Sequence, residues 1–146
     1  MQIINAIVYN RTITVPAFAW FLAQLLKVIN VLLTSKKIDF TRFIGSGGMP
    51  SSHSAFIVSL ATVVGKTRGL DSVEFGITFA ISLIVMYDAA GVRRAAGKQA
   101  KVLNQLLHSH YDKLHFDEKL KELLGHSPFE VVMGALLGIL IGIWLG

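Results

Sequence analysis

The hydrophobic residues of this chain fall into four blocks that polar connections separate. The blocks lie at about Thr12–Leu33, Ser54–Gly65, Glu74–Gly91 and Phe129–Leu145. The longer blocks approach the roughly 20 residues that an α-helix needs to cross a bilayer. The second block becomes long enough only if its helix begins at Ser51 and extends to Lys66, with neighbouring helices covering its polar first turn. We therefore predict an all-α, polytopic membrane bundle with four spans, or three if the second block does not cross.

The connection between the third and fourth blocks has a different pattern. Its apolar residues recur at helical spacing from Val92 to Leu107, while basic residues occupy the other faces. This pattern predicts an amphipathic helix on the membrane surface. Residues 108–124 are polar apart from a short apolar stripe, which favours a loop and a second short surface helix. The sequence shows no internal repeat and no low-complexity tract, so we predict a single integral membrane domain over residues 1–146.

Composition supports a membrane protein. Hydrophobic residues make up 53% of the 146 residues, and the mean hydropathy of +0.58 is too high for an ordinary water-soluble domain. The first residues lack the basic start and the cleavage pattern of a signal peptide, so we expect the first block to act as its own insertion signal. The absence of cysteine excludes disulfides, thiolate metal sites and a cysteine nucleophile.

The net charge of +5 comes from residues in short connections between apolar blocks, which favours lipid headgroups over nucleic acid as the partner. Four spans place connections 34–50 and 92–128 on one side, with ten basic residues against three on the other. The ten are Lys36, Lys37, Arg42, Arg93, Arg94, Lys98, Lys101, Lys113, Lys119 and Lys121. Positive charge is enriched in cytoplasmic connections, so we predict that this side faces the cytoplasm, at the plasma membrane of a bacterium.

A glycine-rich box precedes the second block, where residues 45–48 read Gly-Ser-Gly-Gly and Met49-Pro50-Ser51-Ser52-His53 follows. Glycines allow successive N–H groups, including that of Gly48, to converge on an anion, and a helix start also favours negative charge. The alternative is that the glycines form only a turn and that Ser51 or Ser52 is only a helix N-cap. His53 favours phosphate binding, because ionisable side chains inside membrane helices are usually functional.

A second histidine box precedes the fourth block. Ser127-Pro128-Phe129-Glu130 has the form of a capping box, with serine at the N-cap and glutamate at N3. Glu130 either serves only this cap or also accepts a hydrogen bond from His126, which would leave the other ring nitrogen free and basic. If the two boxes open on the same side, two imidazoles and two helix N-termini face each other, and they could bind and transfer a phosphate.

Charged residues near the boxes are candidates for holding that phosphate. Arg93, Arg94 and Lys98 follow the third block, and we expect one arginine to be a ligand and the other a membrane anchor. Lys27 lies inside the first block on the same face as Gln24 and needs a partner or a wet cavity. Asp88 is the candidate partner, in a structural pair with Lys27 or Arg94; the alternative is that it assists His126.

Two further patterns have simpler interpretations. Gly134, Gly138 and Gly142 repeat every four residues, which allows close approach of another helix within this chain or in a homodimer. The cluster of His108, His110, Asp112 and His115 matches no helical metal-ligand spacing, so we predict no metal site there.

The two boxes together resemble a known superfamily. Pro50-Ser51-Ser52-His53 is similar to the Pro-Ser-Gly-His motif of the type 2 phosphatidic acid phosphatase and vanadium haloperoxidase superfamily. The stretch from His126 to Val131, followed by Gly134-Ala135-Leu136-Leu137-Gly138, is similar to its last motif, where a histidine precedes a carboxylate by four positions. The first box, together with Asp88-Ala89-Ala90-Gly91-Val92-Arg93-Arg94 and Gly97-Lys98-Gln99-Ala100, most resembles a divergent branch of small membrane proteins.

This resemblance implies a membrane-embedded phosphatase of a lipid phosphate or lipid pyrophosphate, without metal or cofactor. His126 would be the nucleophile that forms a phosphohistidine, Glu130 its orienter and His53 the acid that protonates the leaving oxygen. Two elements of the family pattern are missing. Leu120 stands where the last motif has an arginine, and no lysine is followed seven positions later by arginine and proline. A non-catalytic protein that binds lipid phosphate or acts as a scaffold is therefore the alternative, and a small transporter is a third.

Overall fold

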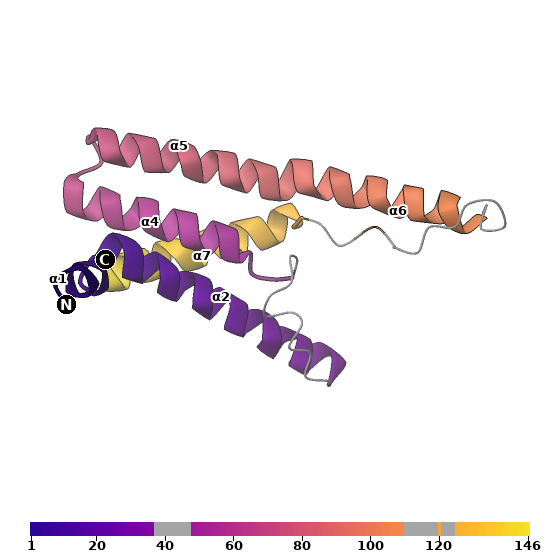
Figure 1. Ribbon diagram of the computed structural model, residues 1–146, viewed down its shortest axis with the longest axis horizontal. Coiled ribbons are helices and arrows are strands. Elements are labelled where there is room, and N and C mark those ends of the chain that lie inside the picture. Colours follow the sequence, from indigo (N-terminus) through magenta and orange to yellow (C-terminus); the bar gives the residue numbers. More distant parts are fainter. Residues whose placement is uncertain (37–47, 110–119, 121–124) are drawn as a thin grey trace.

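The computed structural model describes residues 1–36, 48–109, 120 and 125–146, and these residues form helices and short connections without any strand (Figure 1). In chain order the elements are α1 (Gln2–Val8), α2 (Arg11–Ser35), α4 (Ser52–Arg68), α5 (Val73–Tyr87), the π-helical turn η1 (Asp88–Val92), α6 (Arg93–Ser109) and α7 (Pro128–Leu145). The all-α fold class is thus confirmed, and each predicted apolar block lies within one helix or, for the third, within α5 and η1. The short helix α1 lies before the first block and has no counterpart in the predicted pattern.

Polar caps set the starts of the four long helices of the bundle. The side chains of Asn10, Ser51, Ser72 and Ser127 each accept a hydrogen bond from a backbone N–H in the first turn of α2, α4, α5 and α7. At the other end of α4, Gly69 has a φ of 95° and stops the helix. The apolar blocks and the caps therefore mark the same helix boundaries to within a few residues.

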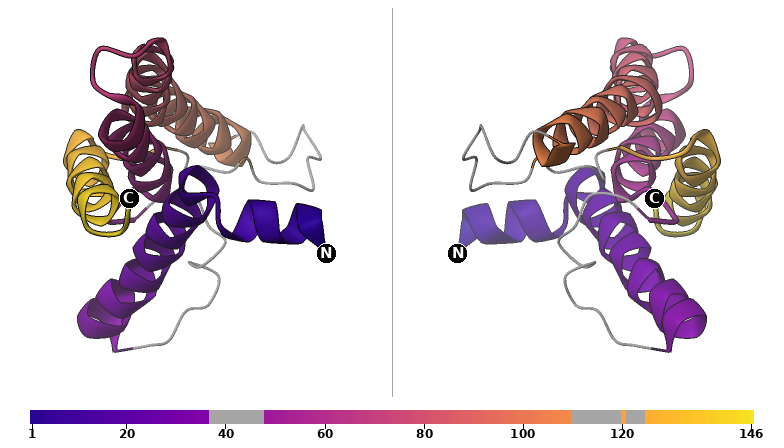
Figure 2. Two further views of the ribbon diagram at one scale, coloured as in Figure 1. Left: turned by 90° about the vertical axis from the view of Figure 1, so that its left-hand side faces the viewer. Right: turned by 90° about the vertical axis from the view of Figure 1, so that its right-hand side faces the viewer.

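Helix α4 is the centre of the bundle, because α2, α5 and α7 all pack against it (Figures 1 and 2). The contact with α7 is close because Gly134, Gly138 and Gly142 face α4. A Cβ atom at Gly134 would lie 2.3 Å from the Ser51 carbonyl oxygen, and one at Gly138 would lie 2.6 Å from that of Ala55. The glycine repeat therefore serves a helix contact within this chain.

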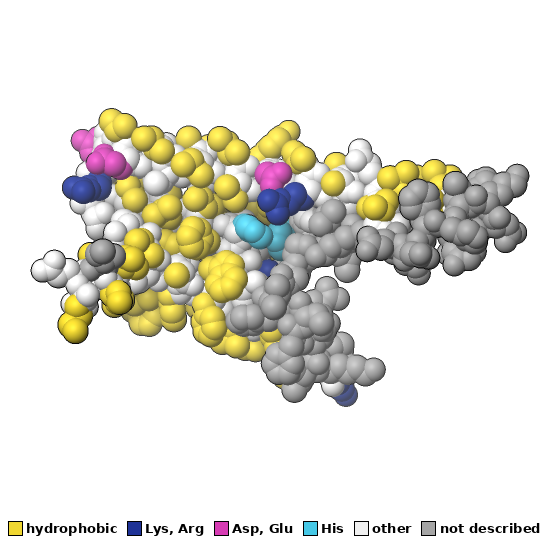
Figure 3. All heavy atoms as spheres, viewed as in Figure 1, with side chains coloured by type: hydrophobic (Ala, Val, Ile, Leu, Met, Phe, Trp, Pro, Cys, Tyr) yellow, Lys and Arg dark blue, Asp and Glu magenta, His cyan; other side chains and the backbone are white. Residues whose placement is uncertain are grey.

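The protein is a multi-pass integral membrane protein. Three segments are long and apolar enough to cross a membrane, namely 11–33, 73–107 and 128–145. Helix α4 has 17 residues, about 26 Å of helix, and runs alongside the other three (Figure 1). In Figure 3, hydrophobic side chains cover the face between charged side chains at its left edge and a second charged group beside the histidines, near the middle of the view. Both histidine boxes lie at one end, opposite the chain termini and the turn between α4 and α5 (Figure 1).

The predicted amphipathic helix exists, but it does not start as a separate element on the membrane surface. Helix α6 continues α5 through η1, and the three form one long rod that extends past the bundle (Figure 1). No proline or turn sequence interrupts residues 87–93, and the π-helical turn accommodates the chain without breaking the helix. The second surface helix predicted for residues 108–124 falls almost entirely outside the described residues.

Candidate functional site

The two predicted histidines lie together at one end of the bundle. Their ring centroids are 6.5 Å apart, with the rings inclined at 61°. His53 is in the first turn of α4 and is exposed, while His126 precedes α7 and is only 4% exposed. The helix starts that carry them are joined, because the Ser51 N–H donates to the Glu130 carbonyl oxygen at 3.0 Å. Packing of α7 on α4 therefore determines the distance between the two imidazoles.

His126 is held in place by its backbone as well as by its side chain. Its N–H donates to the Ala89 carbonyl oxygen in η1 at 2.9 Å. The preceding residue, Gly125, has a φ of 89°, and a Cβ atom there would lie 2.4 Å from the Arg94 backbone nitrogen. Only glycine fits both the backbone conformation and the space at this position. The sequence predicted that this box is part of the site, but no pattern in it predicted the hydrogen bond between the His126 backbone and the π-helical turn.

Glu130 fills both roles that the sequence left as alternatives. Its Oε2 atom lies 3.0 Å from Nδ1 of His126 and accepts the Ser127 backbone N–H at 3.1 Å. In return the Ser127 hydroxyl accepts the Glu130 backbone N–H at 3.3 Å, which completes the capping box. A carboxylate beside Nδ1 favours the tautomer with the proton on that nitrogen, so Nε2 is the nitrogen with the available lone pair.

The protonation state of His126 suits a nucleophile. Burial lowers the pKa of His126 below its ordinary value, and the hydrogen bonds with Glu130 and with the backbone of Gly48 act in the opposite direction. Lys27 also lowers the pKa of His126 through its positive charge. The imidazole is therefore neutral at neutral pH, and a neutral imidazole can attack phosphorus.

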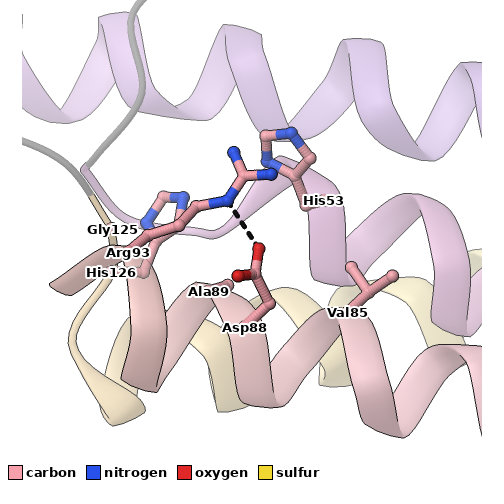
Figure 4. Close-up of a pocket in the computed structure, with 7 residues that line it drawn as sticks. All are labelled: His53, Val85, Asp88, Ala89, Arg93, Gly125 and His126. Carbon is pink, nitrogen blue, oxygen red and sulfur yellow. Dashed lines mark hydrogen bonds and ion pairs between the residues drawn. The ribbon is translucent and has the colours of Figure 1, made fainter. Parts of the chain in front are cut away.

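A small cavity of about 20 Å³ lies between the two histidines (Figure 4). It is lined by His53, Val85, Asp88, Ala89, Arg93, Gly125 and His126. The guanidinium group of Arg93 extends across the cavity between the imidazoles, and its Nε donates to Oδ2 of Asp88 at 2.6 Å. Asp88 of η1 and Arg93, the first residue of α6, thus bring one carboxylate and one cation to the two histidines.

This pairing corrects the one predicted for Asp88. Its partner is Arg93, five residues along the chain, instead of Arg94 or Lys27. Arg94 and Lys98 are exposed on α6 and do not line the cavity. Of the two arginines, Arg93 is therefore the one that lines the cavity. A spacing of five residues places side chains on different faces of a regular α-helix, so helical periodicity could not predict this pair.

Lys27 lies behind the histidines, inside the bundle. It is 2% exposed, and its Nζ donates to Gln24 Oε1 at 2.8 Å and to Ser52 Oγ at 3.2 Å. Gln24, which lies on the same face of α2 as predicted, and Ser52 of α4 are thus the partners of Lys27, in place of the predicted partner Asp88. Gly48, with a φ of 87°, lies beside the Lys27 side chain. Residues 45–47 of the predicted phosphate cradle lie outside the described residues.

Ser51 has the simpler of its two predicted roles. Its side chain is fully buried and caps α4 by accepting the Ser54 N–H, and the Ser54 hydroxyl also donates to it at 3.0 Å. The hydroxyl therefore does not face the cavity, in contrast to the prediction that it binds phosphate. It holds the first turn of α4, which carries His53.

The sequence profile described as "Divergent PAP2 family" matches residues 8–141. This chain belongs to that family. An uncharacterized membrane protein of Bacillus subtilis strain 168, YuiD, is 44% identical over 131 residues, which cover 82% of this chain and 83% of the relative. No solved structure matches this chain at a significant level. The resemblance drawn from the two boxes is thus confirmed for the divergent branch.

This chain of the divergent PAP2 family lacks the arginine of the wider superfamily's last motif. Leu120, which stands in place of an arginine, is exposed, and its backbone exchanges two hydrogen bonds with the side chain of Asn104. In the part of the chain that the structure describes, Arg93 at the start of α6 lines the cavity, and Lys27 of α2 lies beside Ser52 and Gly48. Among the described residues, no group of three His, Cys, Asp or Glu side chains could hold a metal ion. His110, Asp112 and His115 lie outside the described residues.

Proposed function

We propose that this divergent PAP2 protein is a phosphatase of a lipid phosphate or lipid pyrophosphate that acts through a phosphohistidine on His126. The observation that carries the proposal is the pair of imidazoles 6.5 Å apart, one of them bound through Nδ1 to a carboxylate. A phosphoryl group between them could make a contact of about 3 Å to a nucleophile on one side and to an acid on the other. A site at the end of membrane helices suits a substrate whose headgroup lies at the bilayer surface.

In the first step, the Nε2 lone pair of His126 attacks phosphorus, and the bond from phosphorus to the leaving oxygen breaks. Protonated His53 donates its proton to that oxygen, and the dephosphorylated product leaves. In the second step, neutral His53 accepts a proton from water as the water oxygen attacks phosphorus, and the bond from phosphorus to nitrogen breaks. Inorganic phosphate leaves, and both histidines return to their starting states.

Charge stabilisation falls to two cations. Phosphoryl transfer spreads negative charge over the non-bridging oxygens, and fixed cations and N–H donors stabilise it. Arg93 lines the cavity, and Lys27 is held behind it by Gln24 and Ser52. The N-termini of α4 and α7 add the positive ends of two helix dipoles on the same side.

The cavity has space for about one water molecule, so a phosphoryl group needs the cavity to widen. Two of its walls can move outward at little cost, because the side chains of Arg93 and His53 are exposed. The opposite wall, formed by His126, is buried and held by its backbone and by Glu130. We expect the substrate to push the Arg93 and His53 side chains outward, with Arg93 still paired to Asp88, while His126 stays in place.

The test is phosphate release by the protein purified in detergent, with a panel of lipid phosphates and lipid pyrophosphates and a chelator present. We expect turnover that His126→Ala and His53→Ala each abolish. His108→Ala, at the end of α6 and away from both boxes, is the matched histidine control and is expected to keep activity. Activity that survives His126→Ala contradicts the mechanism. Binding of lipid phosphate by the wild type without any turnover favours a non-catalytic lipid-phosphate-binding protein, the function suggested by the neutral Leu120.

We also propose that the site faces the cytoplasm. The described residues place Lys36, Arg93, Arg94, Lys98 and Lys101 at the end of the histidine boxes, against Arg11, Lys66 and Arg68 at the opposite end. The chain contains no cysteine, so single cysteines introduced at each end are unique labels. In intact cells, a membrane-impermeant maleimide should label the Asp71→Cys variant and should not label the Lys101→Cys variant. The reverse pattern contradicts the proposed orientation.

A further inference from the structure

We infer that Asp88 is a positioning residue that presents Arg93 to the phosphoryl group, and that the π-helical turn η1 is the element that makes this possible. The inference rests on the proposed function and adds to it that Arg93 is the arginine that binds the phosphoryl group and that Asp88 holds it in position. Asp88 itself touches neither histidine in a hydrogen bond within the described residues, so its effect is exerted through Arg93.

The π-helical turn accounts for the pairing. Arg93 donates its backbone N–H to the Asp88 carbonyl oxygen, the i to i+5 bond that defines a π-turn. This bond brings residues five apart onto neighbouring positions of the helix surface, which a regular α-helix does only for residues three or four apart. The two side chains can then meet, and Nε of Arg93 lies 2.6 Å from Oδ2 of Asp88.

The geometry of the pair leaves the useful end of the guanidinium group free. Of the five N–H donors of an arginine, Asp88 engages the one on Nε. Figure 4 shows the terminal nitrogens on the side away from Asp88, between His53 and His126. Within the described residues these nitrogens have no hydrogen-bond partner. They are therefore available to bind two oxygens of one phosphoryl group, the bidentate contact for which guanidinium is suited.

The exposure of the pair indicates that it does more than stabilise the fold. The side chains of Arg93 and Asp88 are 52% and 38% exposed. Ion pairs in contact with solvent contribute little to stability, because water screens them and ordering two side chains costs entropy. A side chain that is already ordered loses less freedom when it binds a ligand. The pair is thus better suited to holding Arg93 in position than to stabilising the helix.

Binding of inorganic phosphate and turnover of the lipid substrate test this inference with separate readouts. Arg93→Ala should lower kcat/KM by roughly 10²-fold. Asp88→Ala should raise KM and the Kd of phosphate by about 3- to 10-fold, the cost of ordering one long side chain, and leave the melting temperature nearly unchanged. Asp88→Asn keeps an oxygen that accepts the Nε proton and should restore most of the affinity. Lys101→Ala, an exposed cation further along α6, is the matched control and should change neither quantity.

A double-mutant cycle gives the decisive result. If Asp88 acts through Arg93, adding Asp88→Ala to Arg93→Ala should cause no further loss of phosphate affinity. An equal loss from Asp88→Ala in both backgrounds overturns the inference, and so does a phosphate affinity that Asp88→Ala leaves at the wild-type value. An inactive wild type would refute the proposed function, yet the cycle measured on phosphate binding would still decide whether Asp88 positions Arg93.

Discussion

Replacing Gly134 with alanine would place a methyl group at the closest contact between α7 and α4. The added Cβ atom would lie 2.3 Å from the Ser51 carbonyl oxygen and 3.0 Å from the Ser54 Cβ atom. Since the Ser51 oxygen belongs to the backbone, it cannot rotate away from the methyl group. The two helices would have to separate locally by about 1.1 Å to bring this 2.3 Å distance to the 3.4 Å at which ordinary contact begins.

This displacement should affect both stability and activity. Overpacking of a close helix contact costs about 1–3 kcal/mol, and the higher helix propensity of alanine offsets up to about 1 kcal/mol of that cost. Gly134 lies one turn after Glu130, which orients His126, whereas Ser51 lies directly before the first turn of α4, which carries His53. The separation therefore moves one imidazole relative to the other. A misplacement of about 1 Å in a preorganised site can cost roughly 10²-fold in rate.

Thermal unfolding in detergent, followed by circular dichroism, and phosphate release measure the two effects on one preparation. Gly76→Ala in α5 is the matched control, because a Cβ atom at Gly76 would meet nothing within 4 Å. We expect Gly76→Ala to unfold at the wild-type temperature or slightly above it and to keep activity. If Gly134→Ala is as stable as Gly76→Ala, the close packing of α7 on α4 is wrong. A destabilised variant with full activity would instead refute the link between this contact and the site.

Three further predictions concern individual residues. Glu130→Gln should move the acid limb of the pH–rate profile, measured between about pH 4 and 8, to lower pH. The reason is that Glu130 raises the pKa of His126, and the protonated imidazole cannot attack phosphorus. A move of the acid limb to higher pH contradicts this role of Glu130. The Lys27→Met variant should stay folded, because methionine has a similar shape and the change removes a buried charge. Its kcat/KM should fall by roughly 10²-fold. Full turnover by this variant would exclude Lys27 from the site. Gly125→Ala should lower the stability measured by thermal unfolding by about 1–3 kcal/mol, because φ is 89° at this position and the added Cβ atom would lie 2.4 Å from backbone. Gly91→Ala is the control and should not lower stability, because a Cβ atom there would meet nothing within 4 Å.

Hydropathy predicted the long helices, and cap residues predicted the starts of α4 and α7, because both signals are local. The apolar blocks reflect transfer into a membrane, and each cap satisfies N–H groups within one turn. The hydrogen bond between Glu130 and His126 was also predictable, since residues four apart are neighbours near a helix start. The catalytic roles of these residues and of His53 stay predictions, which the phosphate-release experiment tests.

The sequence did not predict the continuation of α5 into α6, and it predicted the wrong partner for Asp88, both for one reason. Both depend on a single π-helical turn, and the sequence of that turn contains no residue that signals it. The pattern predicted an amphipathic helix on the membrane surface after the third block, and Lys27 or Arg94 as the partner of Asp88. A regular periodicity cannot indicate where one extra residue is inserted into a turn.

The sequence by itself determined that the chain is a helical membrane protein, that two histidine boxes begin two of its helices, and that its motifs are those of the divergent PAP2 family. Only the tertiary structure decided which groups meet. Packing of glycines on α4 sets the 6.5 Å between the imidazoles, and the π-helical turn selects Arg93 over Arg94. Lys27, far away in the chain, reaches the site because α2 packs on α4. Such contacts join residues through space, and local preferences along the chain carry no information on them.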